Sequence, residues 1–380
     1  MNYSLSRSIY DVSKTYAILI DTTKWATAHT KTFTRRMNVC KNFKFLRIAR
    51  NCIRNYAGRL PAPRSTNNAF TLEPLRQREL IRVHGAEVVP FLQGLVTNDV
   101  SRLQEANGPS SMYALFLNRG GRLMYDTIIY RTNDPDTFLL ECDRDASSDF
   151  RRHLRMYRVR KRIDIDTVDD EYVPWVIFNE NGRGDIRTHK AMDLFIAPDP
   201  RVGSMGTRVL APADLNSTKL SKDLWRNHDV VAINPTPDSN YKLLRYKQGI
   251  GEGIEELPPG KCFPLEANAD YLNGVSFNKG CYVGQELTAR VHHSGVIRKR
   301  YMPIRFTAPV SSNQTVKSVA GANLGRVFGH AHNHGVALLR IEPVLHGDQQ
   351  LVLDGERCFV DRPHWWPKDM TAKRGLAAME

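Results

Sequence analysis

The pattern of apolar and polar positions predicts alternating strands and helices from about residue 70 onward. Apolar residues at 80–83 favour a strand, and the segment after Gly85 favours a helix over residues 88–93. Two further strands are expected at 123–130 and 137–141, with a turn signal, Asn-Asp-Pro-Asp, just before the second. This mixture of strands and helices predicts an α+β fold.

The rest of the chain continues this pattern and then changes character. Residues 145–157 place apolar side chains on one stripe of a predicted helix, and a second αβ portion follows from 163 to about 228. A further helix is expected over 241–247. From 296 to about 361 short strands and turns dominate, which predicts a small β-barrel.

Positive charge is concentrated at the N-terminus. The formal net charge of the 380 residues is +14, and residues 1–66 hold thirteen Lys or Arg against two acids, which leaves +3 for the rest. Residues 41–56 also separate apolar from basic side chains on a helical wheel. An acid-poor, Arg-rich leader is typical of a mitochondrial transit peptide, predicted here over residues 1–56 with cleavage after Tyr56. A basic RNA-binding arm is the weaker alternative, and Met37 is a second possible start.

The cysteines exclude several kinds of site. Two of the six lie in the leader, and Cys142, Cys262, Cys281 and Cys358 form no C-x-x-C pair. A disulfide framework, a closed zinc site and a cluster held by one four-cysteine motif are therefore not expected. If iron is bound, this chain supplies one ligand and a partner supplies the others. The sequence also lacks a run of about eighteen apolar residues, so membrane insertion is not expected.

Residues 278–290 contain the strongest chemical signal. Cys281 stands beside Lys279, between Gly280 and Gly284, just before a segment with a helical pattern. A nearby ammonium and a helix start both favour the thiolate, which attacks electrophiles and binds soft metals. The alternative is that Cys281 is a small apolar core residue.

Three more polar residues follow this thiol. Gln285, Glu286 and Arg290 are expected to fix the turn that presents Cys281. Glu286 and Arg290 are four residues apart, so on a helix they share a face and can simply form an ion pair.

The segment Lys279–Glu286 reads Lys-Gly-Cys-Tyr-Val-Gly-Gln-Glu and resembles the signature of a known family. This is the YgfZ-type, iron–sulfur cluster assembly branch of the folate-binding, glycine-cleavage T-protein-like superfamily, which includes CAF-type transferase-like proteins. The resemblance extends from about residue 70 to 365, through matching segments at 91–100, 120–123, 264–277 and 292–300.

This resemblance implies a fold that the apolar pattern alone does not specify. Residues 68–295 would form two interleaved ferredoxin-like α+β domains around a central folate-binding funnel. Residues 296–367 would form the C-terminal β-barrel domain.

The resemblance also implies two carboxylates that contact tetrahydrofolate. Glu266, in Pro264-Leu265-Glu266-Ala267, matches the acid that recognises the pterin ring, and a carboxylate can accept paired hydrogen bonds from an aminopyrimidine edge. Asp126 follows the Gly120-Gly121 turn and matches the catalytic aspartate with a one-residue shift. The alternative for Asp126 is a strand residue that faces solvent.

Together these features predict a mitochondrial matrix factor for the maturation of [4Fe-4S] proteins such as aconitase and lipoate synthase. In this hypothesis Cys281 is the metal ligand. It transiently engages an iron centre or persulfide brought by an A-type carrier, while Lys279 lowers its pKa and neutralises cluster charge. Two alternatives stay open: a folate-dependent aminomethyl or one-carbon transferase that uses Asp126, and a non-catalytic scaffold for cluster carriers.

Histidines supply two weaker candidates. His330, His332 and His334 would put three imidazoles on one face of a strand, although no acid or cysteine nearby completes a metal site, and an exposed barrel strand or turn is favoured. The pair His292-His293 is closer to Cys281 in sequence and could supply a base or a ligand.

Overall fold

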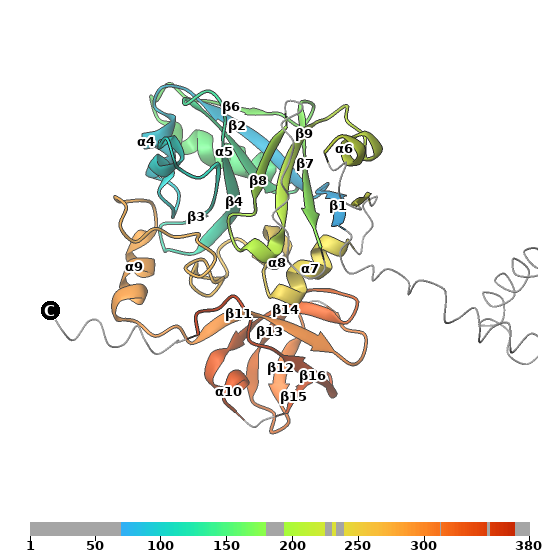
Figure 1. Ribbon diagram of the computed structural model, residues 1–380. Coiled ribbons are helices and arrows are strands. Elements are labelled where there is room, and N and C mark those ends of the chain that lie inside the picture. The colour runs from blue at the N-terminus through green and yellow to red at the C-terminus, as the bar shows by residue number, and fades with distance from the viewer. Residues whose placement is uncertain are drawn as a thin grey trace, which may run out of the picture. The chain divides into compact units, whose positions relative to one another are not determined.

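The computed structural model describes residues 70–179, 194–224, 230–232, 239–311, 313–347 and 350–368 (Figure 1). The predicted transit peptide, with Met37 and Tyr56, lies outside these residues. No helix in the described part of the chain is both long and apolar enough to cross a membrane.

The first sheet is antiparallel, with the strand order β3-β4-β5-β2-β6. Its strands are β2 (Arg78–His84), β3 (Ser111–Leu117), β4 (Leu123–Arg131), β5 (Thr137–Asp143) and β6 (Asp164–Thr167). Three helical elements cover one of its faces: α4 (Val88–Gln93), the 3-10 helix η3 (Val100–Gln104) and α5 (Ser147–Arg158). The strands and helices predicted in this region are confirmed, and the predicted stripe residues Phe150 and Leu154 are buried.

The second sheet has the order β10-β1-β7-β9-β8. Its strands are β1 (Phe70–Pro74), β7 (Tyr172–Phe178), β8 (Phe195–Pro198), β9 (Thr207–Pro212) and β10 (Val230–Ala232), and the 3-10 helix η4 (Gly203–Met205) and α6 (Ser217–Leu224) lie in the same part of the chain. The chain starts in this sheet with β1, builds the whole first sheet, and returns with β7, which pairs with β1. The two sheets are therefore interleaved in sequence.

Strand β3 shows how the first sheet is buried on both faces. Alternate side chains of a strand point to opposite faces. Met112, Ala114 and Phe116 accordingly pack beneath the helices, whereas Tyr113 and Leu115 enter a central core shared with the second sheet. A continuous apolar run is the pattern expected of a strand in this position.

Helices α7 (Asn240–Gln248) and α8 (Gly253–Glu256) connect the sheets to the barrel. Helix α7 begins where the Ser239 side chain accepts a hydrogen bond from the backbone N–H of Lys242, and it ends at Gly249, whose φ of 72° is left-handed. A β-carbon at Gly249 would lie 2.5 Å from Pro303 of the barrel, so glycine permits this close contact.

The C-terminal barrel is closed in the order β11-β14-β13-β12-β15-β16, which confirms the predicted α+β fold with a β-barrel. Its elements are β11 (Lys299–Phe306), β12 (Thr315–Ser318), β13 (Asn323–Ala331), β14 (His334–Arg340), α10 (Ile341–Leu345), β15 (Leu351–Leu353) and β16 (Glu356–Val360). The three candidate histidines lie around the β13–β14 hairpin, and His332 occupies its turn with a φ of 52°. The hairpin turn separates His330 from His334, so the metal arrangement on one strand face is not formed, and the favoured interpretation as a barrel strand or turn agrees with the structure.

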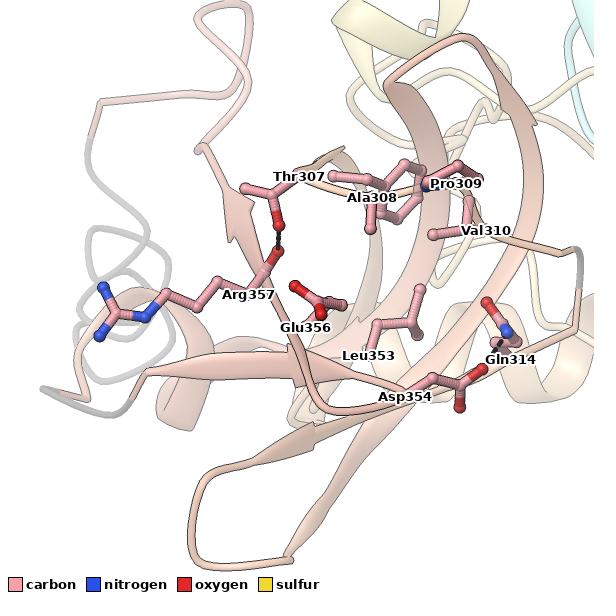
Figure 2. Close-up of a pocket in the computed structure, with 10 residues that line it drawn as sticks. Thr307, Ala308, Pro309, Val310, Gln314, Leu353, Asp354, Glu356 and Arg357 are labelled. Atoms are coloured by element: carbon pink, nitrogen blue, oxygen red, sulfur yellow. Dashed lines mark hydrogen bonds between the residues drawn. The ribbon is translucent and has the colours of Figure 1, made fainter.

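Figure 2 shows a small cavity at one end of the barrel, between the segment that follows β11 and the β15–β16 hairpin. Thr307 Oγ1 donates to the Arg357 carbonyl at 2.8 Å, and Gln314 bonds to Asp354. The cavity volume is about 40 Å³, which is room for a few water molecules.

A buried ionic network lies between the two sheets and helices α7 and α8. Arg208 of β9 donates to Glu141 of β5 at 2.9 Å and to Glu252 at 3.0 Å, and Arg201 pairs with both Asp199 and Glu252 at 2.7 Å. Each of these side chains is at most 5% exposed. Burial alone would raise the pKa of Glu252, but the surrounding arginines hold it well below its usual range. The network fixes the two sheets against each other.

Candidate functional site

Cys281 is exposed on the loop that precedes helix α9 (Gln285–Ser294). The other described cysteines are buried: burial raises the pKa of Cys262 to about 12, that of Cys358 to about 11, and that of Cys142 further. Cys281 is therefore the described thiol that a partner can reach. The alternative that it is a core residue is wrong.

Lys279 anchors this loop to the end of helix α4. Its ammonium donates to the backbone carbonyls of Gln93 at 2.8 Å, Val96 at 2.7 Å and Asn98 at 2.8 Å. A lysine ammonium has three N–H donors, so all of them are used. Burial lowers the pKa of Lys279 to about 8, and the nearby Asp99 carboxylate opposes this shift. Lys279 therefore holds the Cys281 loop in place. Its predicted lowering of the pKa of the Cys281 thiol stays a prediction.

Further contacts hold the loop on the other side of Cys281. The backbone N–H of Val283 donates to the Gly94 carbonyl at 3.0 Å, again at the end of α4. The Gln285 side chain accepts from the backbone N–H of Tyr282 at 3.2 Å. Cys281 therefore sits between two anchored points, and Gln285 closes the turn that leads into α9.

Two glycines bring the Cys281 loop against the turn between β3 and β4. Gly284 has a φ of 80°, and a β-carbon there would lie 2.3 Å from the Asn118 carbonyl oxygen. Gly121 has a φ of 74°, and its β-carbon would lie 3.0 Å from the Gly284 carbonyl oxygen. Both positions require glycine, because other residues would clash in a conformation that they rarely adopt. Two segments that were separate in the sequence thus form one surface.

Helix α9 presents the remaining predicted residues. Glu286 and Arg290 are both exposed, and within the described residues neither side chain makes a hydrogen bond or an ion pair. The contacts thus show neither the ion pair nor a direct role in fixing the turn. His292 stacks on Phe277 with ring centroids 3.5 Å apart, whereas His293 is exposed.

Asp126 lies in β4 and is 3% exposed, so the solvent-facing alternative is wrong. One carboxylate oxygen accepts from the backbone N–H of Gly253 at 3.0 Å, and the other pairs with Arg78 at 3.2 Å. A carboxylate that is enclosed and engaged on both oxygens does not fit the predicted role of steering an amine.

Glu266 is half-buried at the edge of the segment that runs beside the start of β4. One carboxylate oxygen accepts from the backbone N–H of Phe263 at 3.0 Å, and the other has no hydrogen-bond partner within the described chain. That oxygen can accept from a ligand N–H, so Glu266 fits the pterin-recognising role better than Asp126 fits its own.

The Glu266 segment connects to the Cys281 loop through the β3–β4 turn. Leu123 exchanges backbone hydrogen bonds with this segment: its N–H donates to Cys262 at 3.0 Å, and its carbonyl accepts from Gly260 at 2.7 Å. The turn just before Leu123 contains Gly121, which touches Gly284. The two predicted sites thus flank one hairpin.

Comparison with known proteins agrees with this architecture. The family model for the CAF17 C-terminal beta-barrel domain matches residues 298–368. The human protein named iron-sulfur cluster assembly factor IBA57, mitochondrial, is 35% identical over 313 residues, which cover 76% of this chain and 83% of the relative. The chain belongs to the IBA57 family. The mouse IBA57 protein of the same name is also 35% identical, over 84% of this chain and 92% of its own length.

A solved structure extends the likeness of this IBA57-family chain to its fold. The glycine cleavage system aminomethyltransferase T from Bartonella henselae superposes with a TM-score of 0.61 over 79% of this chain and 87% of its own. The sequence identity is 15%, so the match shows a shared fold and not a shared activity.

The partners that organise this site could not be identified from the sequence. Arg78 forms an ion pair with Asp126, and the carbonyls at the end of α4 accept hydrogen bonds from Lys279. No sequence pattern singled out Arg78, because Glu79 stands beside it while its actual partners, Asp126 and Glu141, lie far along the chain. No sequence pattern indicated the acceptors of Lys279, since they are backbone atoms nearly 190 residues away along the chain.

Proposed function

We propose that this chain is a mitochondrial matrix factor that assists the maturation of [4Fe-4S] proteins, with Cys281 as a transient ligand for an iron–sulfur centre. The observation that supports this most is an exposed thiol on a loop anchored at both sides. The relatives' names, mitochondrial iron-sulfur cluster assembly factors, agree with it.

The ligand count makes the interaction transient and dependent on a partner. Clusters are usually held by four protein ligands, most often thiolates, and this chain offers one exposed thiol in its described part. No group of three or more His, Cys, Asp or Glu side chains among the described residues could hold a metal ion. An A-type carrier would supply the other ligands, and [4Fe-4S] apoproteins of the aconitase and lipoate synthase type would receive the product.

Loop anchoring explains how a single thiol can be effective. A ligand on a mobile loop loses conformational freedom when it binds, and that loss weakens the complex. Lys279 and Gln285 hold the backbone on either side of Cys281 before any partner arrives. The thiol is thus presented in a preorganised position.

A complementation experiment tests this function. In cells that lack the protein, we expect Cys281→Ser to leave aconitase activity and protein lipoylation low, while Gly280→Ala, at a neighbouring position with open space, restores both. Equal protein levels of the two variants are required. Full rescue by Cys281→Ser would overturn the proposal.

Tetrahydrofolate binding is a separate part of the proposal, supported by the free oxygen of Glu266. When bound, the pterin would donate to this carboxylate. Isothermal titration calorimetry with tetrahydrofolate should show at least tenfold weaker binding to Glu266→Gln than to the wild type, because an amide cannot accept at both positions. Equal affinities would remove Glu266 from the folate site, and no binding to the wild type would remove folate from the account.

The transferase alternative has less support, because Asp126 is enclosed by Arg78 and Gly253. It predicts turnover of tetrahydrofolate with an aminomethyl donor that is lost in Asp126→Asn and kept in Cys281→Ser. The scaffold alternative predicts that neither substitution affects cluster maturation. These outcomes differ from those expected for a cluster ligand.

A further inference from the structure

Lys279 has no hydrogen-bond donor left for a cluster-bearing partner. Thiolate-ligated iron–sulfur centres are negatively charged, because each thiolate ligand contributes a negative charge. All three donors of the Lys279 ammonium are occupied by backbone carbonyls. If Cys281 receives such a centre, as proposed above, other cations near the loop would supply the free donors and further positive charge.

The β3–β4 turn supplies the first of these cations. Asn118 and Gly121 of this turn lie in van der Waals contact with Gly284, three residues after Cys281. Arg119 stands between these two contact residues and is exposed. Consecutive Cα atoms are about 3.8 Å apart. The Cα of Arg119 therefore lies about 3.8 Å from that of Asn118, which contacts the Cys281 loop.

Helix α9 supplies a second cation on the same side. A β-carbon at Gly121 would lie 3.2 Å from Leu287, so the turn packs on the Leu287 face of the helix. Arg290 follows Leu287 by three residues, which places it on that face one turn further along. It is exposed and makes no ion pair among the described residues.

The segment beside the turn adds two more cations. The Arg122 guanidinium lies 4.4 Å from the centre of the Phe263 ring, and its Nη1 donates to the Lys261 carbonyl at 3.2 Å. These contacts hold Arg122 beside the turn, and the Lys261 side chain is exposed.

We propose that Arg119, Arg122, Lys261 and Arg290 form a cationic rim that recognises the negatively charged, cluster-bearing face of the carrier. The inference rests on the proposed function of Cys281 and names what guides the partner to it. The two acids in these segments, Glu266 and Glu286, leave the rim with a net positive charge. Such a rim speeds encounter with an anionic partner and is weakened by salt.

The experiment compares association rates of a cluster-loaded and a metal-free A-type carrier with the full mature chain, measured anaerobically by stopped flow at low and high salt. For the double variant Arg119→Gln, Arg290→Gln we expect association with the loaded carrier to slow about five- to tenfold at low salt, and its salt dependence to flatten. Association with the metal-free carrier should slow less. The matched control is Arg340→Gln with Arg357→Gln, two exposed barrel arginines.

Three results would overturn the rim: unchanged association rates, an equal slowing of association for both forms of the carrier, or an equal slowing in the barrel control. Circular dichroism checks that each variant is folded. Cys281→Ser separates this inference from the proposed function. It should keep the fast encounter and lose the stable complex, whereas a stable, cluster-containing complex with Cys281→Ser would contradict the function and leave the rim's rate effect intact.

Discussion

At the residue scale, Cys281 and Lys279 show what a local motif can and cannot reveal. The motif correctly indicated a reachable thiol, although glycine and polar neighbours do not decide this alone, because the buried Cys262 also follows Gly260 and Lys261. It suggested that Lys279 acts on the adjacent sulfur. The structure directs the ammonium to three carbonyls at the end of α4, an arrangement that depends on the tertiary fold, and the effect on the sulfur stays a prediction.

The titration of Lys279 gives a prediction at this scale. We expect its pKa near 8 because burial disfavours the charge, and we expect Asp99→Asn to lower it further by removing a favourable carboxylate. An NMR titration of the lysine side chain, assigned with Lys279→Arg, measures both values. An ordinary pKa near 10.4 for Lys279 would show that the amine is not enclosed.

The sign of the accompanying change in stability follows from this pKa. The unfolded chain, with an ordinary lysine pKa near 10.4, binds more protons than the folded chain between that value and about pH 8. The contribution of Lys279 to the free energy of unfolding therefore rises with pH across this window. Urea denaturation at pH 7.5 and 9.5 measures this change. The free energy of unfolding should rise more between the two pH values in the wild type than in Lys279→Arg.

At the element scale, most helices and strands could be predicted from the sequence. The helix expected over 145–157 is observed as Ser147–Arg158, and that expected over 241–247 as Asn240–Gln248. Their apolar stripes and caps are local properties. The contact between the β3–β4 turn and the Cys281 loop could not be derived this way, because it joins segments about 160 residues apart.

That contact makes glycine substitutions informative. Gly284→Ala should lower the free energy of unfolding by about 2–4 kcal/mol, because it adds a clash with the Asn118 carbonyl to an unfavourable left-handed backbone. Gly280→Ala, four residues earlier, meets open space and should change it by less than about 1 kcal/mol. Urea denaturation compares the two, and similar values for both variants would contradict the proposed packing.

At the scale of the whole molecule, neither the interleaving nor the central ionic network follows from the apolar pattern. The pairing of β1 with β7 skips the whole first sheet, and the sequence suggested it only through family resemblance. The network places arginines inside a core, where a pattern analysis expects apolar residues. Its partners come from β5, β9 and the segment before α8, so no local window contains them.

The network gives a prediction about stability. Arg208→Met should lower the free energy of unfolding by about 3–5 kcal/mol, because Glu141 and Glu252 would keep their buried charges and each lose one arginine partner. Arg326→Met, at an exposed position of β13, is the matched control and should change it by less than about 1 kcal/mol. Thermal and urea unfolding measure both, and a mild effect of Arg208→Met would show that the network is not what joins the two sheets.

The central claim is that Cys281 ligates a centre shared with a carrier, and anaerobic reconstitution tests it most directly. The purified chain and a cluster-loaded A-type carrier are mixed, the complex is isolated by size exclusion, and its visible absorption and circular dichroism are recorded. We predict a cluster-containing complex with the wild type and with the buried-thiol control Cys142→Ala, and at least tenfold less with Cys281→Ser. The same cluster signal in the isolated Cys281→Ser complex would contradict the account.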